Sequence, residues 1–193
     1  MRIVRLTFWV ALLLATTASA VTVGDLELLE DLIRIPSVSR DVTNVNRAVR
    51  FMRDRLSSEG MLCRIETMDG GWELLFASND GTVTPDVLFS AHLDAVEAQD
   101  PSQFVPRREN GRAYGRGASD CKEHCVLAAR LMRELRGRVS VGCIFGSDEE
   151  IGGRSTAFMV EKGYGARKLV VVLDSEQYEN AELLSGYLVD AVR

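Results

Sequence analysis

A run of β-branched and apolar residues at 139–145 leads into a cluster of acids and glycines, and this junction constrains the fold most strongly. Asp148, Glu149 and Glu150 follow the run, and two glycines and a segment with helical spacing come next. This order predicts a strand, a tight turn and a helix, with carboxylates at the carboxyl end of the strand. Ligands bind at that end in open α/β sheets. We therefore expect an α/β domain with a site there, the alternative being a solvated acidic turn.

Three further segments place polar residues after predicted strands or turns. The strand predicted at 86–91 runs into His92 and Asp94, whose side chains share one side of the chain because neighbours alternate. A carboxylate so placed can orient a metal-bound imidazole through its second nitrogen. Asp120 follows a glycine-rich stretch, and Asp174 follows an apolar strand predicted at 168–173. Taken singly, these residues could be a hydrogen-bonded core histidine and a helix N-cap. Together they predict one polar site.

The chemistry of these side chains suits a metal-dependent hydrolase. Imidazole and carboxylate are the ligands that zinc and its neighbours prefer. One carboxylate can bridge two metals about 3.5–4 Å apart, and water bound there loses a proton near neutral pH. A carboxylate outside the metal site can take that proton and pass it to a leaving amine. The adjacent pair Glu149 and Glu150 suits a division into one metal ligand and one base.

Three motifs carry a resemblance to a known family. They are SAHLD at 90–94, GRGASDCK at 115–122 and DEEIGG at 148–153. In this order they resemble the acetylornithine deacetylase, succinyl-diaminopimelate desuccinylase and glutamate carboxypeptidase family of dizinc exopeptidases and amidohydrolases, the carnosinase-like metallopeptidases included. The segment LIRIPSVS at 32–39 is similar to the family's opening, and the resemblance covers about residues 25–176.

The resemblance implies a role for each site residue. The implied metal ligands are His92, Asp120, Glu150 and Asp174. Asp94 would orient His92, Asp120 would bridge two metals, and Glu149 would be the general base. The implied cofactor is zinc, two ions in a complete active site, with cobalt or manganese as alternatives. The implied reaction cleaves an amide or peptide bond in a small peptide or an N-acyl amino acid.

The family's fold is a three-layer α/β catalytic domain with a mainly parallel central sheet and helices on both faces. An inserted lid domain serves dimerisation, so a complete protein is expected to be able to form a homodimer. Family members are about twice as long as this chain of 193 residues. We therefore expect residues 21–178 to be the N-terminal portion of the catalytic domain and 179–193 to begin the handover to a lid that is absent or truncated.

The family's last metal ligand is a histidine near the far C-terminus, whereas this chain has only His92 and His124. We expect His124 at the surface, because an exposed histidine needs no special role. Glu176 is the alternative to Asp174 as a ligand. We expect this truncated chain alone to be inactive, and the alternative function is a truncated, non-catalytic metal-binding remnant or fragment of such an enzyme.

The N-terminus has the features of a secretory signal peptide. Two arginines precede an apolar stretch at 6–15, and the small residues Ala18, Ser19 and Ala20 follow. This pattern predicts cleavage after Ala20 and a secreted or periplasmic protein. The apolar stretch is short for a stable membrane anchor, which is the alternative. The 23 basic and 28 acidic residues leave a net charge of −5 with no basic stripe, so we expect no nucleic-acid partner.

Hydrophobic spacing predicts the remaining elements. Helices are expected at 25–35, 44–59, 123–136 and 155–162, strands at 62–67 and 72–77, and a polar loop at 95–112. We expect Asp25 to cap the first helix and Leu127, Leu131 and Leu135 to face the core. The four cysteines are compatible with an oxidising compartment but do not require disulfides.

Overall fold

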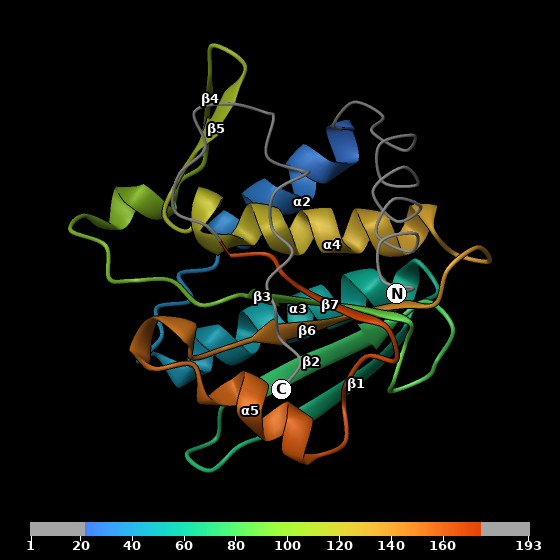
Figure 1. The fold of residues 1–193 in the computed structure, drawn as a ribbon. Helices are drawn as coiled ribbons and strands as arrows, with labels where there is room; N and C mark the ends of the chain where they lie inside the picture. The colour runs from blue at the N-terminus through green and yellow to red at the C-terminus, as the bar shows by residue number, and fades with distance from the viewer. Residues whose placement is uncertain (1–21, 175–193) are drawn as a thin grey trace, which may run out of the picture.

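The structure is a computed structural model that describes residues 22–174, and these form a five-stranded sheet with helices on both faces (Figure 1). The predicted signal peptide at 1–20, the predicted handover segment at 179–193 and Glu176 lie outside the described residues. Across residues 22–174, helices fall short of the length and hydrophobicity that a membrane span requires.

The sheet is mixed, and its parallel part carries the predicted site. The strands are β1 (Leu62–Thr67), β2 (Glu73–Ser78), β3 (Val87–His92), β6 (Val141–Gly146) and β7 (Leu169–Val172). They lie in the order β1-β2-β6-β3-β7. β2 pairs antiparallel with β1 and β6, whereas β3 is parallel to both β6 and β7. The predicted α/β fold is confirmed, with parallel pairing confined to β6, β3 and β7.

Helices cover the two faces of the sheet unequally. They are α2 (Val23–Ile33), α3 (Val42–Ser58), α4 (Glu123–Glu134) and α5 (Arg154–Glu161). The larger core joins α2, α3 and α4 to one face of the sheet, for example at Leu75 and Phe145. The smaller core joins Met159 of α5 to the other face, at Leu74 and Ile144. Neighbouring strand residues point to opposite faces, so the predicted three layers are confirmed, and Figure 1 shows α4 and α5 on opposite sides of the strands.

A capping box fixes where α2 begins. Thr22, and not Asp25 as expected, is the N-cap of α2. The Asp25 amide donates to Thr22 Oγ1 at 3.1 Å, and the Thr22 amide donates to Asp25 Oδ2 at 3.0 Å, which is a capping box. The expectation failed because Asp25 is the third residue of the helix, where it closes this box. Its buried carboxylate also pairs with Arg133 at 2.6 Å, which fastens α2 to α4.

The apolar β7 is only partly buried, because it lies at one edge of the sheet formed by residues 22–174. Two other expectations change. Leu135, the C-cap of α4, is buried as expected, but Leu127 and Leu131 on α4 are half-buried. Small residues such as Ala128 face the core instead, which lets the helix approach β3 and β6 closely. The predicted loop at 95–112 holds a short helical turn (Pro101–Phe104) and β4 (Arg107–Glu109), which pairs with β5 (Arg112–Tyr114).

Candidate metal centre

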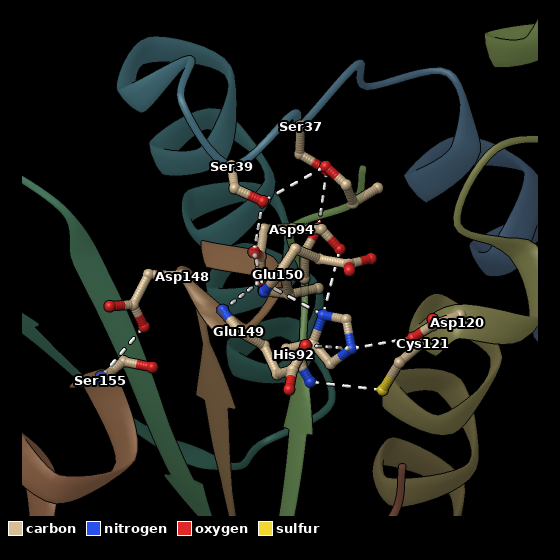
Figure 2. Close-up of polar contacts among 12 residues, drawn as sticks. Ser37, Ser39, His92, Asp94, Asp120, Cys121, Asp148, Glu149, Glu150 and Ser155 are labelled. Carbon is tan, nitrogen blue, oxygen red and sulfur yellow. Dashed lines mark hydrogen bonds and ion pairs between the residues drawn. The ribbon is translucent and has the colours of Figure 1, made fainter. Parts of the chain in front are cut away.

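The predicted site residues meet at the carboxyl ends of the parallel strands. His92 is the last residue of β3 and lies opposite Gly146, the last residue of β6. Glu149 follows β6, and Asp174 follows β7. Asp120 comes from the turn before α4, and Figure 2 shows it facing the imidazole of His92. Because parallel strands end at one edge of a sheet, residues from four distant segments converge there.

The imidazole of His92 is buried and has carboxylates at both nitrogens. Its Nδ1 lies 3.2 Å from both Asp94 Oδ1 and the main-chain carbonyl oxygen of Asp94, and its Nε2 lies 3.0 Å from Asp120 Oδ1 and 3.9 Å from Glu149 Oε2. Burial is the largest single influence and lowers the pKa of His92, but the contacts with Asp94 and Cys121 together outweigh it, and the pKa is raised to about 12. The surrounding carboxylates thus favour a cation beside Nε2, and a metal ion there would take the place of the Nε2 proton.

Three side chains form a cluster that could hold a metal ion. One ligand atom each of His92, Glu149 and Asp174 lies within 4.8 Å of the other two. An imidazole nitrogen and carboxylate oxygens are a donor set that zinc accepts, and bound zinc would draw such atoms to about 2.0–2.2 Å from itself. The contact of Asp94 with Nδ1 leaves Nε2 facing this space. The residues therefore fit a metal.

The carboxylate of Asp94 contacts backbone amides and a hydroxyl as well as the imidazole of His92. Its buried carboxylate accepts hydrogen bonds from the amides of Glu149 and Glu150, each at 3.2 Å, and from Ser39 Oγ at 2.6 Å. Burial raises the pKa of Asp94, but the hydrogen bonds, that with His92 first, lower it further, and the net shift is downward. Asp94 therefore stays ionised and ties His92 to the turn that carries the two glutamates (Figure 2).

Two thiols hold the backbone of His92 beside the Asp120 turn. Cys121 Sγ accepts from the His92 amide at 3.4 Å and donates to the Leu173 carbonyl oxygen at 3.2 Å. Cys125 Sγ donates to the His92 carbonyl oxygen at 3.0 Å. The peptide bond between Asp120 and Cys121 is cis, and Asp120 is not the N-cap of α4. These thiols are structural parts of the site, a role that the cysteine spacing did not predict.

Lys122 fastens the same turn to α2. Its side chain is fully buried, and Nζ donates to the carbonyl oxygens of Leu32 at 2.9 Å and Ile35 at 3.0 Å. These carbonyls lie at the C-terminal end of α2, where a cation is favoured. Burial lowers the pKa of Lys122 to about 8. Lys122 is not among the residues expected at the site, although its place two positions after Asp120 in the GRGASDCK motif is a usable signal.

The two glutamates lie on a short helical turn (Glu149–Ile151) after β6. Burial raises the pKa of both carboxyls, and neighbouring acids add to it, Asp174 for Glu149 and Asp120 for Glu150. Glu150 Oε1 accepts from the Val96 amide at 3.2 Å, and Glu150 is not one of the three clustered residues. The predicted roles, Glu149 as base and Glu150 as ligand, stay predictions.

His124 is buried, so the expectation of a surface position is wrong. It lies four residues before Ala128 and shares the inward face of α4 with it, because residues four apart lie on one helix face. It interacts with the Cys121 thiol. It is not part of the cluster found among residues 22–174.

The chain is similar to hydrolases in sequence. A succinyl-diaminopimelate desuccinylase from Bordetella avium is 36% identical over 135 residues, which are 65% of this chain and 34% of that protein. A desuccinylase from Coxiella burnetii is 33% identical over 135 residues, 65% of this chain and 35% of that protein. The match thus spans about a third of the length of these curated relatives.

Solved structures with the same fold include an M20 family metallo-carboxypeptidase from Sulfolobus solfataricus. It has a TM-score of 0.69 and 21% identity, over 80% of this chain and 38% of that chain. Human carnosine dipeptidase 1 has a TM-score of 0.64 and 22% identity, over 80% and 39%. The sequence profile described as Peptidase family M20/M25/M40 matches residues 88–189, more than half of the chain. With the motifs, the fold and this match in agreement, the chain belongs to peptidase family M20/M25/M40.

Proposed function

We propose that the protein is a metal-dependent hydrolase that cleaves an amide or peptide bond in a small peptide or an N-acyl amino acid. The observation that carries this proposal is the cluster of His92, Glu149 and Asp174 at the ends of parallel strands. Membership of a peptidase family supports it. Relatives named as a desuccinylase and a carnosine dipeptidase support a small substrate of this class.

The proposed cofactor is zinc, two ions in a complete active site. The proposed ligands are His92, Asp120, Glu150 and Asp174. Asp120 lies against His92 Nε2 and lines the same pocket as Glu150, which supports its place between two ions. When bound, zinc supplies Lewis acidity to the substrate carbonyl and to water. Asp94 keeps His92 oriented toward that position.

Glu149 is the proposed general base. Its carboxylate would take the proton of the attacking water and deliver it to the nitrogen of the leaving amine. A base is more effective when its pKa lies nearer the working pH. Burial and the nearby carboxylates raise the pKa of Glu149, which supports this role. His92 lowers it again, though by less.

Zinc titration of the purified chain by calorimetry, followed by hydrolysis assays on dipeptides and N-acyl amino acids, tests the proposal. We expect zinc binding by the chain that is lost in His92→Ala, and hydrolysis by a complete protein that is lost in Glu149→Gln. A complete protein that binds zinc but hydrolyses neither substrate class would favour the non-catalytic alternative. A chain that binds no divalent metal would refute the proposal.

We also propose that the protein is exported. The support is the charged start, the apolar stretch at 6–15 and the small residues before Val21. Sequencing the N-terminus of the mature product should find Val21 first, and an intact Met1 in a membrane fraction would contradict export with cleavage.

A further inference from the structure

We propose that Ser39 is a positioning residue for the metal centre. Its hydroxyl fixes the carboxylate of Asp94, and through Asp94 it fixes both His92 and the turn that begins at Glu149. The proposal rests on the metal-dependent function proposed above, and it adds a residue that acts from a segment 55 positions before Asp94.

The hydroxyl of Ser39 makes a short contact inside the protein. Its Oγ lies 2.6 Å from Asp94 Oδ2, and Ser39 is 2% exposed while Asp94 is 0% exposed. The carbonyl oxygen of Ala95 is a second acceptor, at 3.3 Å. A hydroxyl has one proton to donate. It goes to Asp94, because that oxygen is both nearer and charged, and hydrogen bonds to charged acceptors are the stronger kind.

The backbone presets the position of this hydroxyl. The Ser39 amide donates to the Ala95 carbonyl at 3.2 Å, and the Ala95 amide donates to the Ser37 carbonyl at 2.9 Å. This is a short parallel bridge between the segment after α2 and the segment after β3. Trp72 Nε1 donates to the Ser39 carbonyl at 3.1 Å. The side chain of Ser39 therefore approaches Asp94 from a backbone held on both sides.

The four donors divide evenly between the oxygens of Asp94. Oδ1 receives the Glu149 amide and lies 3.2 Å from His92 Nδ1, which is equally close to the Asp94 main-chain carbonyl oxygen, and Oδ2 receives Ser39 Oγ and the Glu150 amide. Without the Ser39 hydroxyl, Oδ2 keeps a single donor at 3.2 Å. Three of its four contacts then remain, so rotation of the carboxylate is less restricted, and rotation changes its contacts with the imidazole and the turn together. Groups that orient a metal ligand in this way affect metal affinity without touching the metal.

The test compares zinc affinity by calorimetry in the full chain and in three variants. Ser39→Ala should weaken zinc binding roughly 10–100-fold, as is typical when a group that orients a ligand is lost. Ser39→Cys keeps a weaker donor and should fall between Ser39→Ala and wild type. Ser37→Ala is the matched control, because Ser37 lies on the same bridge, is fully buried and donates to the Leu93 carbonyl at 2.6 Å. It should leave zinc affinity within a few-fold of wild type, since its hydroxyl donates to a backbone carbonyl instead of the Asp94 carboxylate.

A second measurement separates positioning from general packing. In nitrogen-15 NMR of the metal-free chain, the Nδ1 proton of His92 should broaden or shift in Ser39→Ala but not in Ser37→Ala. Equal losses of zinc affinity in Ser37→Ala and Ser39→Ala would overturn the proposal, as would unchanged affinity in Ser39→Ala. If Ser39→Ala does not fold, wild-type affinity in Ser39→Cys overturns it. A wild-type chain that binds no zinc overturns the metal-dependent function, and this inference with it.

Discussion

Asp94 contacts both His92 and the turn that carries Glu149 and Glu150, and replacing it by Asn exchanges one carboxylate oxygen for an NH2 group. A carboxylate offers two acceptor oxygens, whereas a carboxamide offers one oxygen and one NH2 group. In one orientation the NH2 group faces His92 Nδ1 and the Glu149 amide, and in the other it faces Ser39 Oγ and the Glu150 amide. The second orientation is the less unfavourable, because the Ser39 hydroxyl can turn to the Ala95 carbonyl.

The loss of stability in Asp94→Asn can be estimated from the hydrogen-bond donors that lose their acceptor. In the better orientation the Glu150 amide is left without its acceptor, and an unsatisfied donor costs about 1–3 kcal/mol. The hydrogen bonds that remain lose their charged acceptor, and each becomes weaker by about 1 kcal/mol. Removing the buried charge returns part of this cost. We expect Asp94→Asn to lower the free energy of unfolding by about 2–4 kcal/mol and to weaken zinc binding about 10–100-fold.

The assay is urea unfolding of the metal-free protein, followed by zinc calorimetry on the folded variant. Asp148→Asn is the control, because Asp148 is also buried and accepts from the amides of Arg154 at 3.1 Å and Ser155 at 3.0 Å at the start of α5. It should destabilise by about 1–3 kcal/mol without a change in zinc affinity. Stability within 1 kcal/mol of wild type in Asp94→Asn, together with unchanged zinc affinity, would refute the view of Asp94 as the junction of the site.

Three shorter predictions follow from the same geometry. In a complete protein, Glu149→Gln should lower kcat by about 10²–10⁴-fold with zinc affinity nearly unchanged by calorimetry, and a large fall in affinity would make Glu149 a metal ligand instead of the base. His92→Ala should weaken zinc binding by more than the roughly 10–100-fold expected for groups that only orient a ligand, and a smaller loss would remove His92 from the metal site. Burial lowers the pKa of Lys122 from 10.5 to about 8, so the unfolded chain binds more protons between these values. The stability of wild type relative to Lys122→Met should therefore rise by about 3 kcal/mol in urea titrations between about pH 8 and pH 10.5, and a flat difference would contradict the buried, strained charge.

The sequence predicts the part of the site that depends on local order. Apolar runs that end in acids specify strands, and the direction of the chain then brings His92, Glu149 and Asp174 to one edge. The spacing of His92 and Asp94 likewise predicts their contact, because residues two apart share one side of a strand. Both features can be predicted once the strands are taken to be parallel, without knowing the order of the strands in the sheet.

The rest depends on tertiary contacts that no local pattern records. Ser39 and Asp94 meet only because a bridge joins segments 55 residues apart. The buried position of Lys122 depends on where α2 ends, and a lysine on its own predicts a surface residue. The expected surface position of His124 is wrong for the same reason, because its burial depends on which face of α4 packs against the sheet. The partial exposure of β7 follows from its place at the edge of the sheet, which its apolar composition does not reveal.

The strand order has a consequence for how the protein is made. β2 and β3 follow each other in the chain, but β6 lies between them and pairs with both. During synthesis, more than 50 residues must therefore be added after His92, up to Gly146, before β3 can pair with the whole of β6. Pairings between distant segments form slowly, and an unpaired apolar edge invites association with other chains. His92 and its partners come together only after that insertion, so we expect the capacity to bind metal to appear at the end of folding, and a nascent chain stopped before Gly146 to lack it.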